Sequence, residues 1–102
     1  MLINITIQTF MSENELELSQ SRWESSKDKY LPRLYTLGLE RFTTTRIWTK
    51  ADKHSLAHVW EYRDKEAMDN CMPIWSEIEA TWRETIIMKT TSYRGVQISC
   101  DA

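Results

Sequence analysis

Two segments with the periodicity of an amphipathic helix, residues 12–38 and 64–82, constrain the fold more than any other feature of the sequence. Each lies between segments that alternate in polarity or are rich in β-branched and aromatic residues, which is typical of strands. The expected strands cover residues 2–10, 41–49, 56–62 and 85–99. The resulting order, β-α-β-β-α-β, predicts one ferredoxin-like α+β domain over residues 1–102, an antiparallel sheet with two helices on one face.

The expected helices carry recognisable end signals and two internal prolines. Ser12 followed by Glu15 fits a capping box, Gly38 is a plausible C-terminal cap, and Asp64 begins the second helix. Gln20 and Lys27 interrupt the apolar stripe of the first helix. Because proline lacks an N–H group and crowds the preceding turn, Pro32 should kink or restart the first helix, and Pro73 should divide the second into two short pieces. Gly95 is a candidate β-bulge in the last strand.

The first expected strand has one isoleucine face and one polar face. Ile3, Ile5 and Ile7 alternate with Asn4, Thr6 and Gln8, and we expect the isoleucine face to meet the helices. The face away from the helices should then carry apolar side chains that the chain itself leaves uncovered: Leu2, Phe10, Leu56, Trp60 and Tyr62. An uncovered apolar face indicates an interface, so we expect a twofold homodimer formed through the open sheet face.

Composition argues against several classes of function. A net charge of -2 with scattered Lys and Arg does not favour a nucleic-acid or membrane partner. No segment has the length and apolarity of a membrane span, and the first residues do not form a signal peptide. The two cysteines, Cys71 and Cys100, make neither a disulfide framework nor a metal-ligand pattern, which favours a reducing, cytoplasmic setting. With two glycines in the chain, a glycine-built nucleotide site is not expected either, so no cofactor is predicted.

Polar residues on the first and third strands are the candidate catalytic groups. His58 could act as a general acid or base in an enclosed pocket, or it could be a hydrogen-bonded histidine packed in the dimer core. Asn4, Thr6 and Gln8 share one face and could orient a substrate carbonyl or stabilise an enolate oxygen. The alternative is a polar lining that holds water inside the barrel.

Aromatic and cationic residues supply the candidate ligand contacts. Arg46 could bind a carboxylate or phenolate, although an ion pair with Glu61 or another acid on the neighbouring strand is favoured. Trp60 and Tyr62 could form the wall of an aromatic-ligand site, and Trp48 is a further candidate. The sequence leaves open whether Arg46 and Trp48, or Thr45 and Ile47, face the pocket. Among the five tryptophans, Trp75 and Trp82 are expected in the core.

Several of these segments together resemble the dimeric α+β barrel superfamily, with the NIPSNAP-like and antibiotic-biosynthesis monooxygenase-like groups nearest. The resemblance rests on three segments: Tyr30-Leu31-Pro32-Arg33-Leu34 before Gly38, Phe42 to Thr49, and His58-Val59-Trp60-Glu61-Tyr62 followed by Asp64 and Trp75. The resemblance implies a homodimeric barrel, and its members include cofactor-independent oxygenases, haem-degrading enzymes, lactone isomerases and cyclases. In the haem-degrading branch, a histidine on the second helix works with an asparagine on the first strand. Asn4 matches the asparagine, but residues 65–83 contain no histidine, so haem chemistry is not expected.

Two functions remain open at this point. In the first, a small homodimer binds and transforms an apolar or aromatic molecule without metal or nucleotide, in a monooxygenase-, isomerase- or cyclase-like reaction. His58 would then move a proton, Asn4 or Gln8 would hold an oxygen, and Trp60 would shape the wall. In the second, the protein is a non-catalytic ligand-binding or assembly module of the NIPSNAP-like type.

Overall fold

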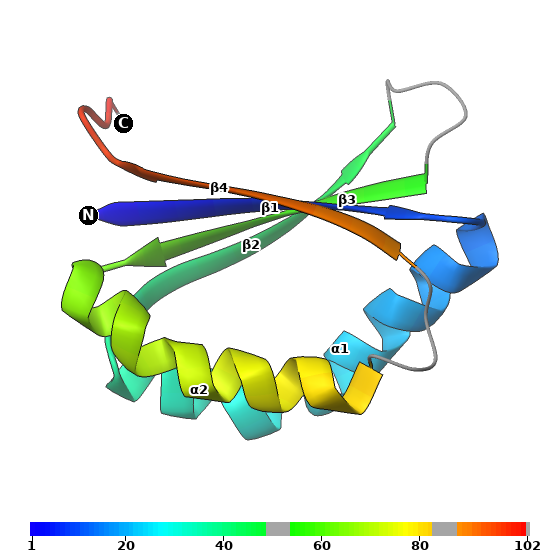
Figure 1. The fold of residues 1–102 in the computed structure, drawn as a ribbon, viewed down its shortest axis with the longest axis horizontal. Helices are drawn as coiled ribbons and strands as arrows, with labels where there is room; N and C mark the ends of the chain where they lie inside the picture. Colours follow the sequence, from blue (N-terminus) through cyan, green and yellow to red (C-terminus); the bar gives the residue numbers. More distant parts are fainter. Residues whose placement is uncertain (49–53, 83–87, 102) are drawn as a thin grey trace.

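The computed structural model describes residues 1–48, 54–82 and 88–101, and it confirms the expected order of elements. The elements are β1 (Leu2–Phe10), α1 (Glu13–Thr36), β2 (Leu39–Ile47), β3 (His54–Tyr62), α2 (Lys65–Trp82) and β4 (Met88–Val96). The antiparallel sheet has the strand order β2-β3-β1-β4, and both helices cover the same side of it (Figure 1). The second strand begins two residues earlier than expected. The third strand also begins two residues earlier than expected, and residue 49 of the expected second strand and residues 85–87 of the expected last strand lie outside the described residues.

Capping contacts fix where both helices begin. The hydroxyl oxygen of Ser12 accepts a hydrogen bond from the backbone N–H of Glu15 at 3.2 Å, and Oδ1 of Asp64 accepts one from the N–H of Ala67 at 2.8 Å. These contacts satisfy N–H groups that the first helical turn leaves free. The sequence signals at Ser12 and Asp64 are therefore confirmed.

Both helices continue through their prolines. α1 does not restart at Pro32, and α2 is a single helix through Pro73, so the predicted division of the second helix is wrong. Each proline removes one intrahelical hydrogen bond. Because both prolines lie on exposed helix faces, water can solvate the carbonyl groups that lose their partners.

The two faces of the sheet are reversed relative to the sequence prediction. Asn4 and Thr6 are each 3% exposed on the side of the helices, whereas Ile5 is 40% exposed on the open side. Directly opposite residues on antiparallel strands share a face, and this brings Trp60 opposite Asn4 and His58 opposite Thr6. His58, Trp60 and Tyr62 therefore lie on the helix side, together with Leu2, Phe10 and Leu56. The prediction that the open face carries these apolar residues is wrong.

The register between β1 and β4 continues through Gly95, which lies opposite Ile3, so the predicted bulge at Gly95 is wrong. The irregularity in the sheet lies instead between Leu39 and Arg41 at the start of β2. This point follows Gly38, which ends the turn after α1 with a positive φ of 111°. A Cβ atom at Gly38 would lie 2.5 Å from the Cβ atom of Ala67, so the glycine also allows α2 to approach this turn.

The apolar core lies mainly between the helices and the β2–β3 half of the sheet. Its main cluster contains Trp23, Tyr30, Leu34, Leu39, Tyr62, Ala67, Met68, Cys71, Ile74 and Ile78. A smaller cluster of Phe10, Leu16 and Leu56 closes the other end. α2 packs against β2 and β3 rather than centrally beneath the sheet. This off-centre packing leaves space beneath β1 and β4.

A candidate ligand cavity

A cavity of about 410 Å³ occupies this space between the sheet and the two helices. Its polar wall comes from the strands and consists of Asn4, Thr6, Gln8, His58, Thr90, Ser92 and Arg94. Its apolar wall comes from both helices and from β2 and β3, and includes Trp23, Phe42, Trp60, Tyr62, Met68, Met72, Trp75 and Ile78. A cavity of this size with a few placed polar groups has the character of a small-molecule site.

Stacked rings form the apolar wall. The ring centroids of Trp60 and Trp75 are 4.6 Å apart, and Trp23 stacks on Trp75 at 6.1 Å. Phe42 lies 5.3 Å from Trp23 and 5.9 Å from Trp60, so four rings make one continuous surface. Such a surface favours a flat, apolar ligand because rings gain from offset stacking beyond simple burial.

Tyr62 anchors this wall to α2. Nε1 of Trp75 donates a hydrogen bond to the Tyr62 hydroxyl oxygen at 2.9 Å. Tyr62 is 1% exposed, and its burial raises the pKa of the phenol to about 12. Tyr62 thus stays neutral at physiological pH and fixes the position of the Trp75 ring.

A chain of hydrogen bonds runs along the polar wall from β1 to β4. Nδ2 of Asn4 donates to Oγ1 of Thr6 at 2.9 Å, and Thr6 is bonded to the Ser92 hydroxyl at the same distance. Nε of Arg94 donates to Oδ1 of Asn4 at 3.1 Å. The sequence analysis placed Asn4 and Thr6 together correctly, but it missed Ser92 and Arg94. Alternation along β4 puts Thr90, Ser92 and Arg94 on one face, and this was the signal that pointed to them.

His58 lies between the strands that flank it and is held by two hydrogen bonds. Its Nε2 atom is 2.8 Å from Oε1 of Gln8, and its Nδ1 atom is 3.0 Å from the Thr44 hydroxyl oxygen. The ring also stacks on Phe42, with centroids 5.6 Å apart. Burial lowers the pKa of His58 to about 4, so the imidazole is neutral at pH 7. A neutral imidazole with both ring nitrogens hydrogen-bonded is a weak base, and its position and orientation are well defined.

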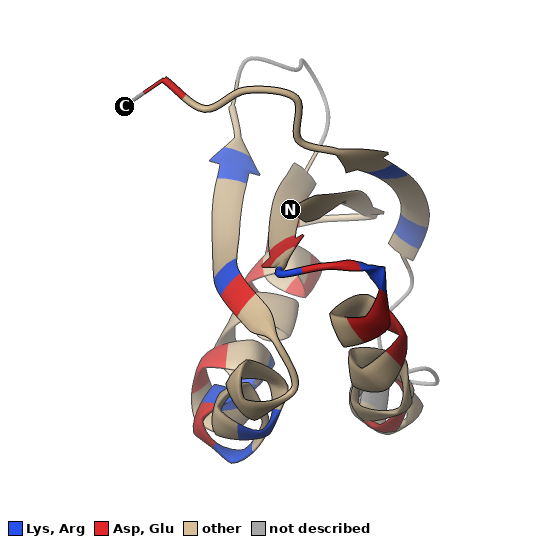
Figure 2. Cartoon of the chain, turned by 90° about the vertical axis from the view of Figure 1, so that its left-hand side faces the viewer, with Lys and Arg blue, Asp and Glu red and all other residues tan. Residues whose placement is uncertain are grey.

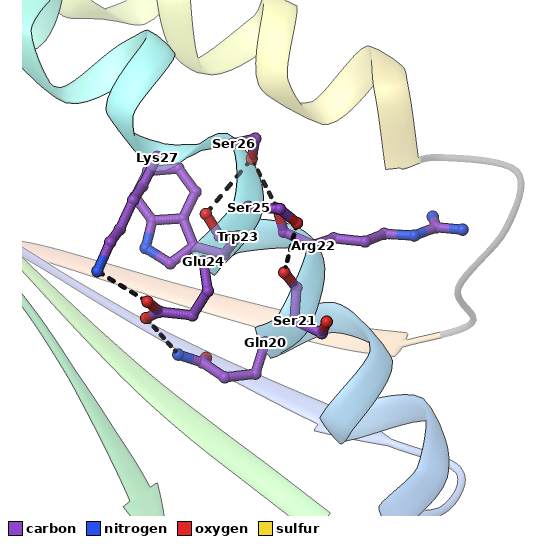
Figure 3. Close-up of polar contacts among 8 residues, drawn as sticks. All are labelled: Gln20, Ser21, Arg22, Trp23, Glu24, Ser25, Ser26 and Lys27. Carbon is purple, nitrogen blue, oxygen red and sulfur yellow. Dashed lines mark hydrogen bonds and ion pairs between the residues drawn. The ribbon is translucent and has the colours of Figure 1, made fainter.

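Two buried polar atoms in the cavity wall have no hydrogen-bond partner within the part of the chain that the structure describes: Oε1 of Gln20 and Nε1 of Trp60. Nε2 of Gln20 donates to Glu24 at 3.4 Å, and Glu24 also pairs with Lys27 at 2.8 Å on the same helix (Figure 3). These contacts orient the Gln20 amide. Unpaired buried polar groups are costly, so both atoms are candidate ligand contacts, one an acceptor and one a donor. The interruption of the apolar stripe at Gln20 was the sequence signal for it.

Two predicted ligand contacts lie outside this cavity. Arg46 shares the helix-side face with Phe42 and Thr44, which resolves the orientation of β2. Its Nη2 atom, however, pairs with Glu13 of α1 at 3.1 Å rather than with Glu61 or another acid of the neighbouring strand. Arg46 lines a second pocket of about 380 Å³ between α1 and β2. Trp48 is 86% exposed and lies beyond the end of β2.

The described part of the chain contains neither a cluster of metal ligands nor a membrane-spanning helix. Within residues 1–48, 54–82 and 88–101, no group of three or more His, Cys, Asp and Glu side chains is arranged to hold a metal ion. Neither described helix combines the length and the apolar character needed to cross a membrane.

Comparison with known proteins identifies the family. Residues 1–97 match the model described as a domain of unknown function, DUF6974. The chain belongs to this family. No curated protein sequence matches the chain of this DUF6974 member.

Solved structures share the fold of this DUF6974 member over nearly its whole length. A dimeric ferredoxin-like protein from an uncultured marine organism is 28% identical, with a TM-score of 0.89 over 99% of this chain and 97% of that chain. HapK from Hahella chejuensis is 15% identical, with a TM-score of 0.76 over 100% and 97%. The monooxygenase from ActVA-Orf6 of Streptomyces coelicolor, solved with nanaomycin D, is 6% identical, with a TM-score of 0.66 over 99% and 92%. The expected ferredoxin-like fold and its likeness to monooxygenases of this type are therefore confirmed.

Proposed function

We propose that this protein binds a small, mostly apolar molecule with a flat ring in the cavity between the sheet and the helices. The observation that carries the proposal is the division of a 410 Å³ cavity into a wall of stacked rings and a wall of hydrogen-bonded polar groups. A flat ring would lie against Trp60 and Trp75, with its polar substituents toward β1 and β4. A monooxygenase that shares this fold was solved with the ligand nanaomycin D, which supports a small-molecule site in this fold.

The unpaired atoms of the cavity define the polar substituents of this ligand. Nε1 of Trp60 requires an acceptor such as a carbonyl oxygen, and Oε1 of Gln20 requires a donor such as a hydroxyl group. Arg94 uses its Nε atom for Asn4, and its terminal nitrogens supply further donors for an oxygen of the ligand. The ligand class that fits is therefore a hydroxylated or quinone-like aromatic molecule.

We propose further that the polar wall transforms this ligand without metal or nucleotide, in a monooxygenase-, isomerase- or cyclase-like reaction. Asn4 and Gln8 would hold an oxygen that gains negative charge, and His58 would exchange a proton through its Nε2 atom when Gln8 gives way to the ligand. The alternative is a non-catalytic ligand-binding or assembly module of the NIPSNAP-like type. The support for this alternative is that the low pKa of His58 and its two hydrogen bonds also suit a positioning role.

The partner that we propose for this protein is a second copy bound through the open sheet face. Ile5 and Tyr93 lie opposite each other on this face, 40% and 60% exposed, with Ile3, Ile7 and Val59 beside them. Among the described residues, more charged positions lie on the helices than on the strands (Figure 2), and the open face also carries Glu61, which pairs with Arg41, and Lys89. A largely apolar face of this kind fits a twofold copy of itself, and the 28% identical relative is described as dimeric.

Thermal unfolding with four matched probes tests the cavity. The probes share one ring system: naphthalene has no polar group, 1-naphthol adds a hydroxyl donor, and 1,4-naphthoquinone adds two carbonyl acceptors. The fourth probe, 5-hydroxy-1,4-naphthoquinone, carries both kinds of group. We expect the midpoint to rise most with the hydroxyquinone, since a ligand that binds only the folded state stabilises it by mass action. Trp60→Phe should reduce the gain from the carbonyl groups, and Trp48→Phe, outside the cavity, should not. No shift with any probe, or equal effects of the two variants, would contradict the proposed site.

Catalysis is tested separately, with whichever probe binds. Oxygen uptake and product formation are followed for the wild type, Asn4→Ala and His58→Gln. Turnover that falls in both variants while binding persists supports the enzyme. Binding without turnover of any probe by the wild type supports the non-catalytic module instead.

A further inference from the structure

The residues that follow β4 form an arm that makes few contacts with the rest of the described chain. Residues 97–101, here called the C-terminal arm, leave the sheet on the side away from the helices (Figure 1). Figure 2 shows the arm turning from the β4 edge across that side. Ile98 in this arm is 97% exposed.

Few contacts hold the arm. The backbone N–H of Gln97 donates to the carbonyl oxygen of Met1 at 2.9 Å, and Nε2 of Gln97 donates to the carbonyl oxygen of Ser99 at 3.4 Å. Ordering a chain segment costs conformational entropy, and neither contact buries apolar area that offsets the cost. Burial of the nearly fully exposed Ile98 against another molecule would supply the apolar area that these contacts lack.

We infer that the C-terminal arm packs on the surface of a second copy of this chain and buries Ile98 against it. This inference rests on the proposed dimer, because the arm lies on the same side as the open face through which that dimer forms. The relative described as dimeric matches 99% of this chain at 28% identity, which leaves about one of 102 residues unmatched. Most of the arm therefore belongs to the structure that the two proteins share. Asp101 is the one charged residue of the arm, so the arm carries no positive charge that would attract an anionic surface. Its composition fits a protein surface better.

The native cysteines provide a direct test with the full chain. Cys71 is fully buried and Cys100 is exposed in the arm, so a benzophenone maleimide will label Cys100. Irradiation of the labelled wild type should give a covalent dimer on a denaturing gel. The matched control is the double variant Cys100→Ser with Ser76→Cys, which moves the label to an exposed position on α2. This control should give no covalent dimer, and equal yields from the two positions would overturn the inference.

A substitution in the arm separates this inference from the dimer itself. Ile98→Asp should raise the dimer dissociation constant by roughly tenfold or more, whereas Ser99→Asp adds the same charge one residue later and should leave it nearly unchanged. The dissociation constants are measured by sedimentation over a dilution series. If the wild type dimerises, Ile98→Asp leaves the dissociation constant unchanged and Cys100 gives no cross-link, the proposed role of the arm is wrong but the proposed dimer is not. A monomeric wild type overturns both.

Discussion

The Nε2 atom of His58 lies 2.8 Å from the amide oxygen of Gln8, across the boundary between β3 and β1. An amide oxygen only accepts, so Nε2 of His58 carries the proton. The Nδ1 atom then has a free lone pair, which accepts the hydrogen bond from the Thr44 hydroxyl at 3.0 Å. This pair of contacts holds the neutral imidazole in one tautomer and joins three strands at the polar wall of the cavity.

Acid should unfold the protein partly through His58. The folded state keeps His58 neutral, with a pKa of about 4, while the unfolded chain has the ordinary value of 6.5. Between these values the unfolded state binds more protons, so the contribution of His58 is fully present above about pH 6.5 and is lost as the pH falls to 4. We expect a loss on the order of 3 kcal/mol across this window. It is measured by urea unfolding at closely spaced pH values.

The matched variant for this prediction is His58→Gln, which retains hydrogen-bonding groups but does not titrate. Its stability should fall less between pH 6.5 and 4 than that of the wild type, because only the carboxylates contribute in that variant. Parallel pH profiles for the two proteins would show that His58 is not buried in its neutral form.

The two glycines should respond very differently to alanine. Gly38→Ala places a Cβ atom 2.5 Å from the Cβ atom of Ala67 at a φ of 111°, so we expect a loss of at least about 2 kcal/mol in the free energy of unfolding. At Gly95 a Cβ atom meets nothing within 4 Å, and Gly95→Ala should change stability by less than about 0.5 kcal/mol. Chemical denaturation of both variants compares them. Similar losses would mean that the approach of α2 to the turn is not close.

Ile5 and Leu18 offer a matched pair for the dimer. In the isolated chain they are 40% and 43% exposed, but Ile5 lies on the open sheet face and Leu18 on α1. Ile5→Asp would bury a carboxylate in the proposed interface and should raise the dimer dissociation constant roughly 100-fold or more. Leu18→Asp should leave the constant unchanged. Light scattering coupled to size-exclusion chromatography measures both, and dissociation by Leu18→Asp alone would place the interface on the helices.

Alkaline titration should reveal Tyr62. Burial raises the pKa of its phenol to about 12, so the change in ultraviolet absorbance near pH 12 should be smaller in Tyr62→Phe than in the wild type. The folded pKa exceeds the ordinary value of 10, so this burial stabilises the protein below pH 10 and the contribution is lost between pH 10 and 12. A complete titration by pH 11 in the folded wild type would contradict the burial of Tyr62.

The order of the elements and the starts of the helices could be predicted from local sequence. The hydroxyl of Ser12 and the carboxylate of Asp64 cap helices through contacts only three residues long, so nearby residues suffice to determine them. On α2, the apolar residues Ala67, Cys71 and Ile78 face the core of the protein, as their helical spacing predicts. The effect of Pro73 could not be predicted in the same way, because the exposure of its helix face decides how easily the lost hydrogen bond is replaced.

The sequence alone determined that Ile3, Ile5 and Ile7 share one face of β1 and Asn4, Thr6 and Gln8 the other, because side chains alternate along any strand. Alternation likewise determined that His58, Trp60 and Tyr62 share one face of β3. Only the tertiary structure decided that the polar face meets the helices. The reason is that burial is favourable for polar groups only when they find partners, and those partners, Ser92 and Arg94, come from β4, some 90 residues along the chain. Once that network lines the cavity, the isoleucines are left on the open face of the sheet.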